Sequence, residues 1–508
     1  MSITLTYPGV YLQEIPDSEH SIQGVSTSTT AFIGIAKKGP VDEATTIHSF
    51  TGYERIFGGL WNKSNLSFAV YQYFLNGGRD AVVVRVHDHA KVATFQIDGS
   101  DLRIQASSAG IWGTNLDIRI SYQLANDIID NYDNTTTFSL TVRDTETTAW
   151  EIFRNLSTRR EDRRYITHLV NKWSNLIRVI EPESELKKPP EGKFKLVTGS
   201  ADDGYRYLTD DKIIGSRGVS RTGIYSLDEA GAISMLCIPP YNEGNTTSKN
   251  VYVKALEYCE ARRAILIVDP PEEWTTKKPT VDEVETEFGN IRHPNAVVFL
   301  PRINAPDHIR KNNGGNSRSL VPSGVVAGMI SRIDVERGVW KGPAGIEVTP
   351  VGVSDFTPQL TDEDSHMLNS LGINCLRMIP SSGMAVSGYN TMSKTDEWKY
   401  IPVRRTAFFI EESLYRGTQW VVFEANNEAL WSQLRHNVGA FMHDLFSKGA
   451  FQGGTLEEAY LVKCDHETTT QYDINRGVVN IIVGFAPLKP AEFVILKIQQ
   501  LADQQVMS

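Results

Sequence analysis

Five short, almost uninterrupted apolar runs constrain the fold of this chain more than any other feature. Such runs are typical of strands that are covered on both faces of a sheet. Helical segments near Phe68–Leu75 and Asn250–Arg262 separate neighbouring runs, and a strand–helix–strand order predicts a parallel α/β sheet. The runs are Thr30–Ala36, Ala81–Val86, Ile233–Pro239, Ala264–Val268 and Ala296–Leu300.

The stretch between the second and third runs differs in pattern. From about His87, short segments of alternating apolar and polar residues are separated by Gly, Asn, Asp and Ser, which predicts a β-rich insertion. Within it we expect a helix over Asn155–Asn175 and an exposed loop over Leu186–Lys195. The expected helix carries a basic cluster that invites a nucleic-acid hypothesis, but interleaved acids favour a solvated helix face. The cluster is Arg159, Arg160, Arg163 and Arg164.

Length and charge narrow the class of protein. A chain of 508 residues is expected to form two to four domains. Its formal net charge of −10 argues against a general affinity for nucleic acid, and no apolar run approaches the roughly 20 residues that span a bilayer. The four cysteines are far apart and form no CxxC pair, so we expect free, buried thiols and no metal site.

The last hundred residues predict a compact α/β unit. We expect a helix over Tyr400–Tyr415, a strand over Gln419–Phe423 and a long helix over Asn427–Lys448, with Asn427 as its N-cap. Two further strands are predicted at Ala459–Cys464 and Val478–Phe485. The long helix has one apolar stripe, formed by Leu430, Leu434, Val438, Phe441 and Leu445.

Both ends of the chain are strand-like. Phe493–Leu501 alternates with period two, and Pro487 and Pro490 prevent it from returning as a tight hairpin. Ile3, Leu5 and Tyr7 alternate with threonines in the same way. Each end is either tucked into its own domain or is an arm that adds a strand to another molecule's sheet.

Several longer stretches resemble the contractile tail sheath proteins of bacteriophage tails and of phage-tail-like injection systems. The stretch 362–380 retains that family's bridge pattern, whereas Ser387–Asn390 departs from its Trp-Gly-Ala-Arg-like segment, so the contacts of that loop do not carry over. The resembling stretches are IEESLYRGTQWVVFEANNEALW (410–431), LVKCD (461–465), RGVVNIIVGFAPLKPAEFVI (476–495), VPSGVVAGMISRIDVERGVWKGPAG (321–345) and YPGVYLQE (7–14).

The resemblance implies α/β and α+β domains in a multidomain chain. It implies a subtilisin-like α/β middle domain formed by 21–90 and 205–370, with a β-rich outer domain, 91–204, inserted into it. It further implies a C-terminal α+β inner domain, 371–488, between an N-terminal arm, 1–20, and a C-terminal arm, 489–508.

The resemblance also assigns roles to residues near the ends. The arm strands are Ile3, Leu5, Tyr7, Val10 and Leu12 at one end and Phe493, Val494, Ile495, Leu496 and Ile498 at the other. The sheet that receives them is expected at Leu461, Val462, Val478, Asn480 and Ile482. The polar side of the long helix is either a solvated face or, in a sheath, a contact with the inner tube; its residues are Gln433, Arg435, His436 and Lys448.

The implied function is that of a structural subunit. It would polymerise into a helical tube around an inner tube protein, meet baseplate and tail-terminator proteins, and contract from a metastable extended state. Assembly is expected in the bacterial cytoplasm, as part of a virion or of an extracellular or membrane-docked particle, without nucleic acid, cofactor or membrane insertion. A non-contractile filament is the alternative structural role.

A peptidase is the alternative enzymatic function, because a subtilisin-like fold raises the question. A serine hydrolase needs an exposed serine, a histidine within hydrogen-bond reach and a carboxylate. Asp269 ends a strand and Ser323 opens PSGVVAGMIS, but His293 and His308 lie in loops rich in Pro and Asn. No phosphate-binding GxxxxGK[ST] and no HExxH occurs, so we expect no enzyme activity.

A charged set follows Ser323 on the predicted helix. It could link neighbouring subunits or form a salt-bridged surface, and the sequence does not separate these. The set is Arg332, Asp334, Arg337 and Lys341.

Overall fold

A computed structural model describes residues 21–122, 137–183, 185–206, 208–241, 245–309, 317–345, 348–379 and 383–489. The chain divides into two compact units. Residues 26–405 form the α/β unit, and the C-terminal unit combines 406 onward with the N-terminal stretch that ends at Val25. The two parts of the C-terminal unit are therefore far apart in sequence.

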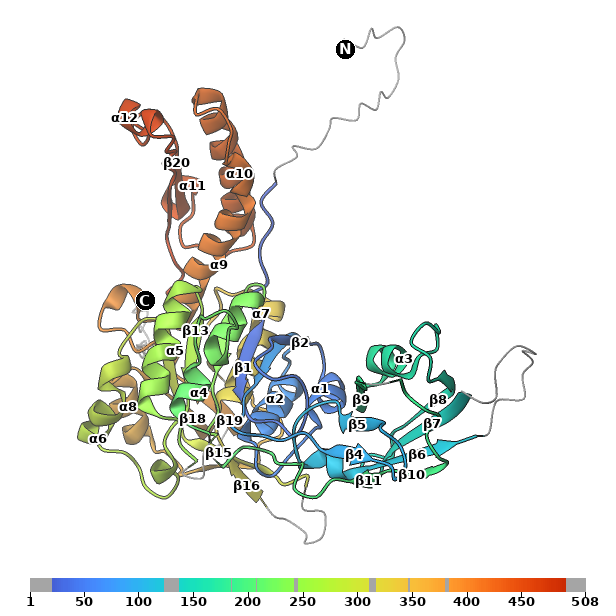
Figure 1. Cartoon of the computed structure of the whole chain (residues 1–508). Coiled ribbons are helices and arrows are strands. Elements are labelled where there is room, and N and C mark those ends of the chain that lie inside the picture. Colours follow the sequence, from blue (N-terminus) through green and yellow to red (C-terminus); the bar gives the residue numbers. More distant parts are fainter. Residues whose placement is uncertain are drawn as a thin grey trace, which may run out of the picture. The chain divides into compact units, whose positions relative to one another are not determined.

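An eight-stranded sheet forms the centre of the α/β unit (Figure 1). Its strand order is β19-β18-β14-β13-β12-β1-β3-β2, and the six inner strands are parallel. All five predicted strands are present in it. The strands are β1 Thr30–Gly34, β2 Thr45–Ile47, β3 Ala81–Arg85, β12 Met235–Cys237, β13 Ile265–Val268, β14 Ala296–Leu300, β18 Ile373–Ile379 and β19 Gly383–Ser387.

Helices cover both faces of this sheet, which explains the continuous apolar runs. Ala31 and Ile33 of β1 belong to one core with α5, whereas Phe32 faces the other way and lies edge-on to Tyr73 of α2. The prediction of a buried parallel sheet is confirmed. The helices are α1 Phe50–Phe57, α2 Asn65–Leu75, α4 Asp210–Ile214, α5 Lys249–Ala261, α6 Val281–Phe288, α7 Ser323–Arg337 and α8 Asp362–Ser370, with 3-10 turns η2 Gly223–Glu229, η3 Glu272–Thr275, η4 Gly289–Ile291 and η5 Asp396–Trp398.

The sheet extends past the domain boundary that we predicted at residue 371. Strand β18 pairs in parallel with β14, and β19 then pairs antiparallel with β18 and closes that edge. The residues up to Arg405 therefore belong to the α/β unit. A small antiparallel sheet, in the order β16-β15-β17, lies beside it, with β15 Arg302–Pro306, β16 Ser317–Leu320 and β17 Asp355–Thr357.

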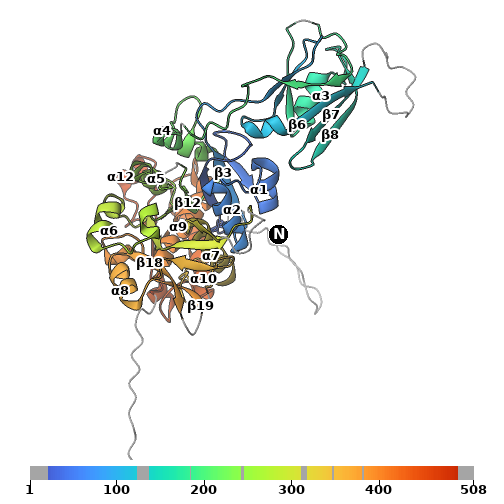
Figure 2. The ribbon, with the colours of Figure 1, turned by 90° about the horizontal axis from the view of Figure 1, so that it is seen from below.

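The predicted β-rich insertion consists of two four-stranded antiparallel sheets around one core (Figure 2). Their orders are β10-β6-β7-β8 and β11-β4-β5-β9. The elements are β4 Thr94–Gln96, β5 Arg103–Ala106, η1 Ile111–Asn115, β6 Leu116–Ser121, β7 Thr137–Asp144, β8 Trp150–Ser157, α3 Ile166–Trp173, β9 Ile177–Ile180, β10 Gly192–Lys193 and β11 Lys195–Leu196.

Two predictions within the insertion are only partly confirmed. The helix expected over Asn155–Asn175 is confined to α3, because the preceding residues complete β8 and a turn in which the Arg164 guanidinium donates to the Asn155 carbonyl at 2.7 Å. The loop expected at Leu186–Lys195 is not wholly exposed. Leu186 and Phe194 are buried, since β10 and β11 complete the two sheets.

The C-terminal unit begins within α9 and is mainly helical. The Asn427 side chain accepts from the Leu430 N–H at 3.1 Å, so the predicted cap of α10 is confirmed, and the predicted stripe is buried. The strand predicted at Gln419–Phe423 is wrong. The chain there forms a 3-10 turn, because Trp420 and Val421 pack onto the core of α10. The elements are α9 Ile401–Gly417, η6 Gln419–Val421, α10 Glu428–Ser447, α11 Leu456–Ala459, β20 Tyr460–Lys463, α12 Gln471–Asn475 and β21 Ile482–Phe485.

Candidate assembly surfaces

A two-stranded antiparallel sheet, β20 with β21, is the main candidate for assembly. Tyr460 lies opposite Phe485 and Lys463 opposite Ile482. An isolated pair of strands is marginally stable in water, and its outer edges present backbone groups to any strand that can pair with them.

The register shows which backbone groups point outward. The Ala486 N–H donates to the Ala459 carbonyl at 2.8 Å. Two residues further along each strand, the backbone N–H and C=O groups of Leu461 and Gly484 therefore also point toward the partner strand. Residues of the other parity then point away. These are Tyr460 and Val462 on β20 and Val483 and Phe485 on β21. Within the described part of the chain, no further strand pairs with either edge.

One face of this sheet exposes two apolar side chains beside Lys463. Leu461 is 55% exposed and Ile482 is 50% exposed, and the register places both on the same face. By contrast, every residue of β13 in the α/β unit is buried. The small sheet therefore offers both hydrogen-bonding edges and apolar area.

The structure corrects part of the predicted receiving sheet. Leu461, Val462 and Ile482 lie in the paired strands, but Val478 and Asn480 do not. The Val478 N–H donates to the Asp473 carbonyl at 2.9 Å, and the Asn480 N–H donates to the Thr469 hydroxyl at 3.0 Å. These bonds hold the two residues in the connection after α12, so strand pairing begins only at Ile482.

Both predicted arms fall outside the described residues. The N-terminal set is Ile3, Leu5, Tyr7, Val10 and Leu12, and the C-terminal set is Phe493, Val494, Ile495, Leu496 and Ile498. Their role as arm strands stays a prediction.

The residues predicted to contact an inner tube lie on α10 in two groups. Arg435 donates to Glu428 at 2.7 Å and to the Cys464 carbonyl, and Lys448 donates to Asp444 at 2.6 Å. These two cations are therefore partnered within their own chain. Gln433 and His436 are exposed away from the buried stripe and can reach another molecule.

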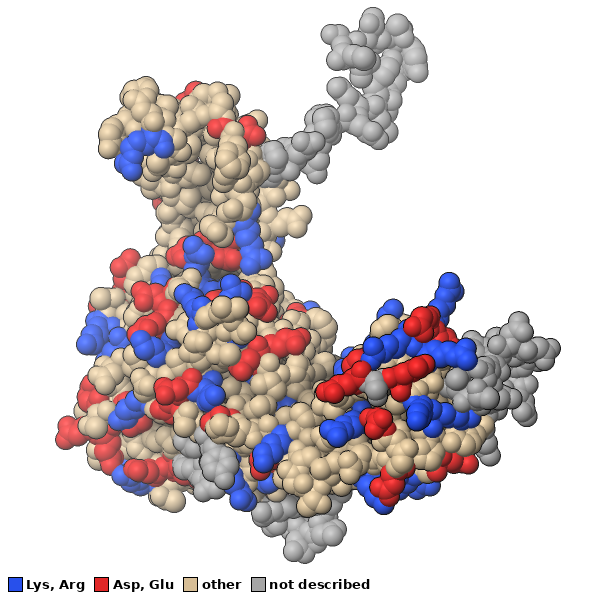
Figure 3. Space-filling view, in the orientation of Figure 1, with Lys and Arg blue, Asp and Glu red and all other residues tan. Residues whose placement is uncertain are grey.

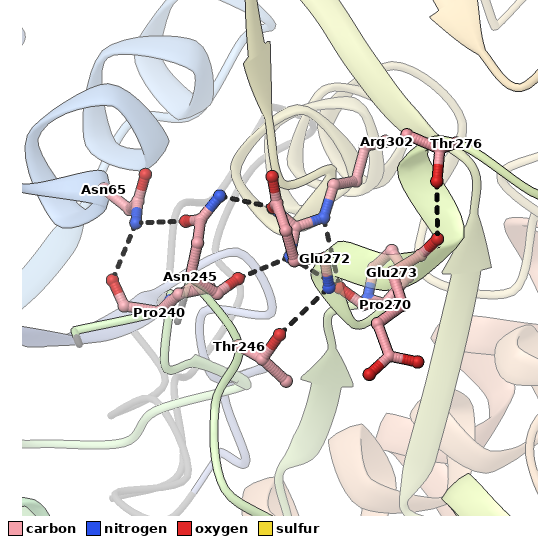
Figure 4. Close-up of polar contacts among 9 residues, drawn as sticks. All are labelled: Asn65, Pro240, Asn245, Thr246, Pro270, Glu272, Glu273, Thr276 and Arg302. Atoms are coloured by element: carbon pink, nitrogen blue, oxygen red, sulfur yellow. Dashed lines mark hydrogen bonds and ion pairs between the residues drawn. The ribbon is translucent and has the colours of Figure 1, made fainter. Parts of the chain in front are cut away.

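A polar network fills the place where an α/β sheet often binds a ligand. Ligands of such sheets bind beyond the carboxyl ends of the strands, where the strand order reverses, and here the order reverses between β1 and β12. Near that point the Asn65 amide donates to the Pro240 carbonyl at 2.9 Å and to the Asn245 side chain at 2.8 Å (Figure 4). The chain's own side chains thus occupy this position.

Arg302 is the charged centre of the same network. Its guanidinium is 1% exposed and donates to the carbonyls of Asn245, at 2.6 Å, and Pro270, at 2.9 Å, and to the Glu272 carboxylate (Figure 4). Burial lowers the pKa of Arg302. Every contact is internal, so the network joins the loops after β12, β13 and β14.

Ser323 and Asp269, the residues considered for a peptidase, lie at the N-terminus of α7. The Ser323 hydroxyl donates to Asp269 at 2.8 Å, and the Ser323 N–H donates to the same carboxylate at 3.0 Å. Both side chains are buried, and Asp269 lies at the N-terminus of α7, where negative charge is favourable. His293 approaches Glu260 and His308 lies against Tyr71, so neither is placed to take the serine proton.

Two members of the charged set, Arg332 and Asp334 of α7, bond within their own unit. Asp334 is 2% exposed and accepts two bonds from Arg405, both at 2.6 Å, while the Arg332 guanidinium donates to the Thr349 carbonyl at 2.9 Å. Arg405 is 5% exposed and also donates to the Thr27 carbonyl at 2.7 Å. Asp334 therefore has a role inside its own subunit.

Sequence reasoning missed Arg405 and Arg302. The signal was a single charged residue in an otherwise apolar context, since Arg302 directly follows the run that ends at Leu300-Pro301.

The predicted free thiols are confirmed, because all four cysteines are unbridged and buried. The described residues contain no cluster suited to hold a metal ion. None of the helices that the structure describes combines the length and the apolar content of a membrane span.

Comparison with known proteins supports the resemblance. Residues 393–500 match the family model of the phage tail sheath C-terminal domain, a segment that contains α10, β20 and β21. No protein of curated function is significantly similar in sequence.

Solved structures extend the similarity of fold to nearly the whole chain. The sheath complex of an extracellular contractile injection system, PVC, in its contracted state has a TM-score of 0.58 at 19% identity, over 98% of this chain and 99% of that one. The contracted helical sheath of the anti-feeding prophage gives 0.56 at 21% identity, over 98% and 100%. The sheath tail protein of Listeria innocua gives 0.61 at 14% identity, over 92% and 97%.

Proposed function

We propose that this chain is a structural subunit of a contractile sheath, without enzymatic activity. Many copies form a helical tube around an inner tube, and the tube contracts from a metastable extended state to drive the inner tube through a target envelope. The observation that carries the proposal is the two-stranded sheet, open at both edges among the described residues, within the segment that matches the sheath C-terminal domain.

The open edges explain why strands from other copies are needed. Val483 and Phe485 each turn one N–H and one C=O outward, so one edge of β21 accommodates about four hydrogen bonds, each contributing roughly 0.5–1.5 kcal/mol. Ordering about six arm residues costs about 1–2 kcal/mol per residue. Hydrogen bonds alone are therefore insufficient.

Apolar burial supplies the difference. Val494, Leu496 and Ile498 share one face of the predicted C-terminal strand, and burying each contributes roughly 1.5–3 kcal/mol. The exposed Leu461 and Ile482 provide an apolar surface on the receiving side. Because each subunit gives strands to different neighbours, the contacts are heterologous and produce a helical tube rather than a closed ring.

Contraction then repacks the bodies while the arms stay paired. The hinges are the segments around Pro16–Gly24 and Pro487–Pro490. The first hinge is shorter than the sequence suggests, because the Val25 N–H donates to the Ser413 hydroxyl at 3.1 Å and Ile22 lies against Gly417. The described end of this segment, Ile22–Val25, is thus held within its own unit.

The remaining assignments rest on the same proposal. Gln433 and His436 contact the inner tube protein, and the ends of the sheath meet baseplate and terminator proteins. The α/β unit is related to subtilisin-like folds, with 91–204 as an outer inserted domain, 406–488 as the inner domain and 1–20 and 489–508 as arms. Subunits assemble in the bacterial cytoplasm into a phage tail or an injection particle.

The direct test is truncation after Pro487. The shortened chain should fold as a monomer, with the circular dichroism of the full chain, and form no sheath under negative-stain microscopy. Normal sheaths from this variant would refute the arm. Tubes of the full-length chain that never shorten would instead support the non-contractile filament.

A proline pair tests the edge itself. Val483→Pro removes an N–H that points outward, so it should leave β20–β21 pairing intact and abolish assembly. Gly484→Pro removes an N–H that faces β20 and should disrupt the small sheet as well. Assembly by Val483→Pro at the wild-type level would contradict the proposed edge.

A further inference from the structure

The turn between α9 and α10 holds two apolar side chains in solvent. Phe423 is fully exposed, at 102%, and Val422 is 58% exposed. Phe423 also has a φ of +79°, a backbone conformation that is unfavourable for a bulky residue. Exposure and strain on one aromatic residue indicate that this turn is shaped to contact something.

The turn is fixed by its own contacts. The Val421 N–H donates to the Thr418 carbonyl at 3.1 Å, and the Glu424 N–H donates to the Val421 carbonyl at 3.0 Å. The Asn426 amide donates to the Val478 carbonyl at 3.0 Å and accepts from the Trp431 indole at 2.8 Å. Since Trp420 and Val421 pack inward, the two following side chains are held outward in a defined position.

The N-terminal segment approaches this turn along α9. Val25 is bonded to Ser413, and Ile22 lies so close to Gly417 that a Cβ on the glycine would be 2.7 Å from the Ile22 side chain. Moving backward from Val25 to Ile22, the segment thus runs toward the C-terminal end of α9, where the turn begins. Residues 1–20 continue from there.

The sequence before Ser21 contains a suitable apolar group. Ile15-Pro16 is the first apolar pair upstream, after the polar stretch Asp17–His20. Ile15 is seven residues from Ile22, a reach of about 23 Å when the chain is extended, and Phe423 is six residues from Gly417, so Ile15 can reach the turn. The nearness of the N-terminal segment to the turn therefore favours this segment over a partner from another molecule.

We propose that Val422 and Phe423 are a docking site for this chain's own N-terminal segment, centred on Ile15 and Pro16. Docking sets the direction in which the arm leaves its subunit. This inference rests on the proposed function in one respect only, namely that residues 1–14 remain available to pair with a neighbouring copy. A neighbouring subunit and the inner tube protein are the competing occupants.

A disulfide trap on the full-length chain tests the docking. In Ile15→Cys/Phe423→Cys, mild oxidation should form a disulfide within one chain, detected by non-reducing electrophoresis and peptide mapping. The four native cysteines are buried and do not compete. The matched control is Ile15→Cys/Val219→Cys, since Val219 is equally exposed but lies in the α/β unit. Equal cross-linking in both variants overturns the proposal.

Mixed sheaths identify the donor of the segment. When chains carrying only Ile15→Cys are coassembled with chains carrying only Phe423→Cys, we expect no cross-linked dimer. A dimer would assign the turn to a neighbouring subunit and overturn the proposal. The trap within one chain is measured on unassembled protein, so it remains informative even if no sheath forms.

Proteolysis provides a second measurement without new cysteines. Val422→Ser/Phe423→Ser should release the segment and speed cleavage after Glu14 by a glutamate-specific protease roughly tenfold, followed by intact mass. Val219→Ser should leave the rate unchanged. An unchanged rate in the double variant contradicts docking.

Discussion

The two sheets of this protein solve the problem of their edges in opposite ways. The eight-stranded sheet is covered by helices on both faces, and β2 and β19 close its two sides with antiparallel strands. The sheet of β20 and β21 has two strands, an exposed apolar face and no further strand in the described chain. The first has its partner strands within one subunit, whereas we propose that the second is completed by strands from other copies.

The density of charged side chains on the surface also differs between the two units. The α/β unit shows acids and bases side by side, while the face of the C-terminal unit that presents β20 and α10 carries few charged side chains (Figure 3). Interspersed charges keep a surface in water, and their depletion is typical of interfaces. We therefore expect substitutions in the α/β unit to change the free energy of unfolding, and substitutions in the small sheet to change assembly.

Breaking the buried ion pair should have the largest effect on folding. Asp334→Ala leaves Arg405 unpaired and buried, so the free energy of unfolding should fall by about 3–5 kcal/mol in urea denaturation. The control is Asp362→Ala, whose carboxylate is 96% exposed and pairs with Arg377, with an expected loss of about 0–1 kcal/mol. Similar losses in both variants would show that burial does not decide the effect.

A cavity in the large sheet should be the next largest effect. Ile267 is fully buried in β13, so Ile267→Ala should lower the free energy of unfolding by about 2–5 kcal/mol. Urea denaturation of the full chain measures it. A loss below about 1 kcal/mol would contradict the complete burial described for this strand.

The buried carboxyl of the α/β unit should make its stability depend on pH. Burial raises the pKa of Asp269 to about 7, above its ordinary value of 3.8 in the unfolded chain. Between about pH 4 and 7 the unfolded chain loses this proton and the folded chain keeps it, so stability should fall as pH rises, by at most about 1.4 kcal/mol per pH unit.

Asp269→Asn isolates that contribution. The variant cannot titrate at this position, so its free energy of unfolding should lack the fall that the natural chain shows between pH 4 and 7. Urea denaturation at several pH values compares the two slopes. Parallel slopes would show that Asp269 does not titrate in this range.

The smallest effect on folding should accompany an effect on assembly. Ile482 is half exposed on β21, so Ile482→Ala should change the free energy of unfolding by less than about 0.5 kcal/mol. It should nevertheless raise the protein concentration needed to form sheaths, because arm strands lose an apolar contact. Unchanged assembly would show that this face of the small sheet is not part of the interface between subunits.

The sequence predicted the large sheet better than the small unit. Strands such as Ala264–Val268 are apolar throughout because both faces are covered, and that pattern is visible without tertiary structure. The run Gln419–Phe423 is apolar after its first residue, yet it forms a turn, since Trp420 and Val421 pack onto α10 and no strand of the described chain pairs with them. Periodicity does not reveal which neighbour a short run will find.

The candidate surface was predictable in part for a similar reason. Leu461, Val462 and Ile482 lie in short apolar runs of the kind that strands form, but Asn480 is held by Thr469, a side-chain contact that no periodicity encodes. Arg405 was missed because a charged residue in an amphipathic helix is ordinarily exposed. Its burial depends on Asp334, which is far away in sequence.

The bonds of Arg405 bear on mechanical force. Both connections between the two units, at residues 25–26 and 405–406, adjoin groups that this one guanidinium holds: Arg405 itself and the carbonyl of Thr27. A pull through either connection therefore also acts on Asp334 of α7, the partner of this guanidinium. Load applied to an arm would be shared by a helix rather than peel β1 away from its neighbours one residue at a time.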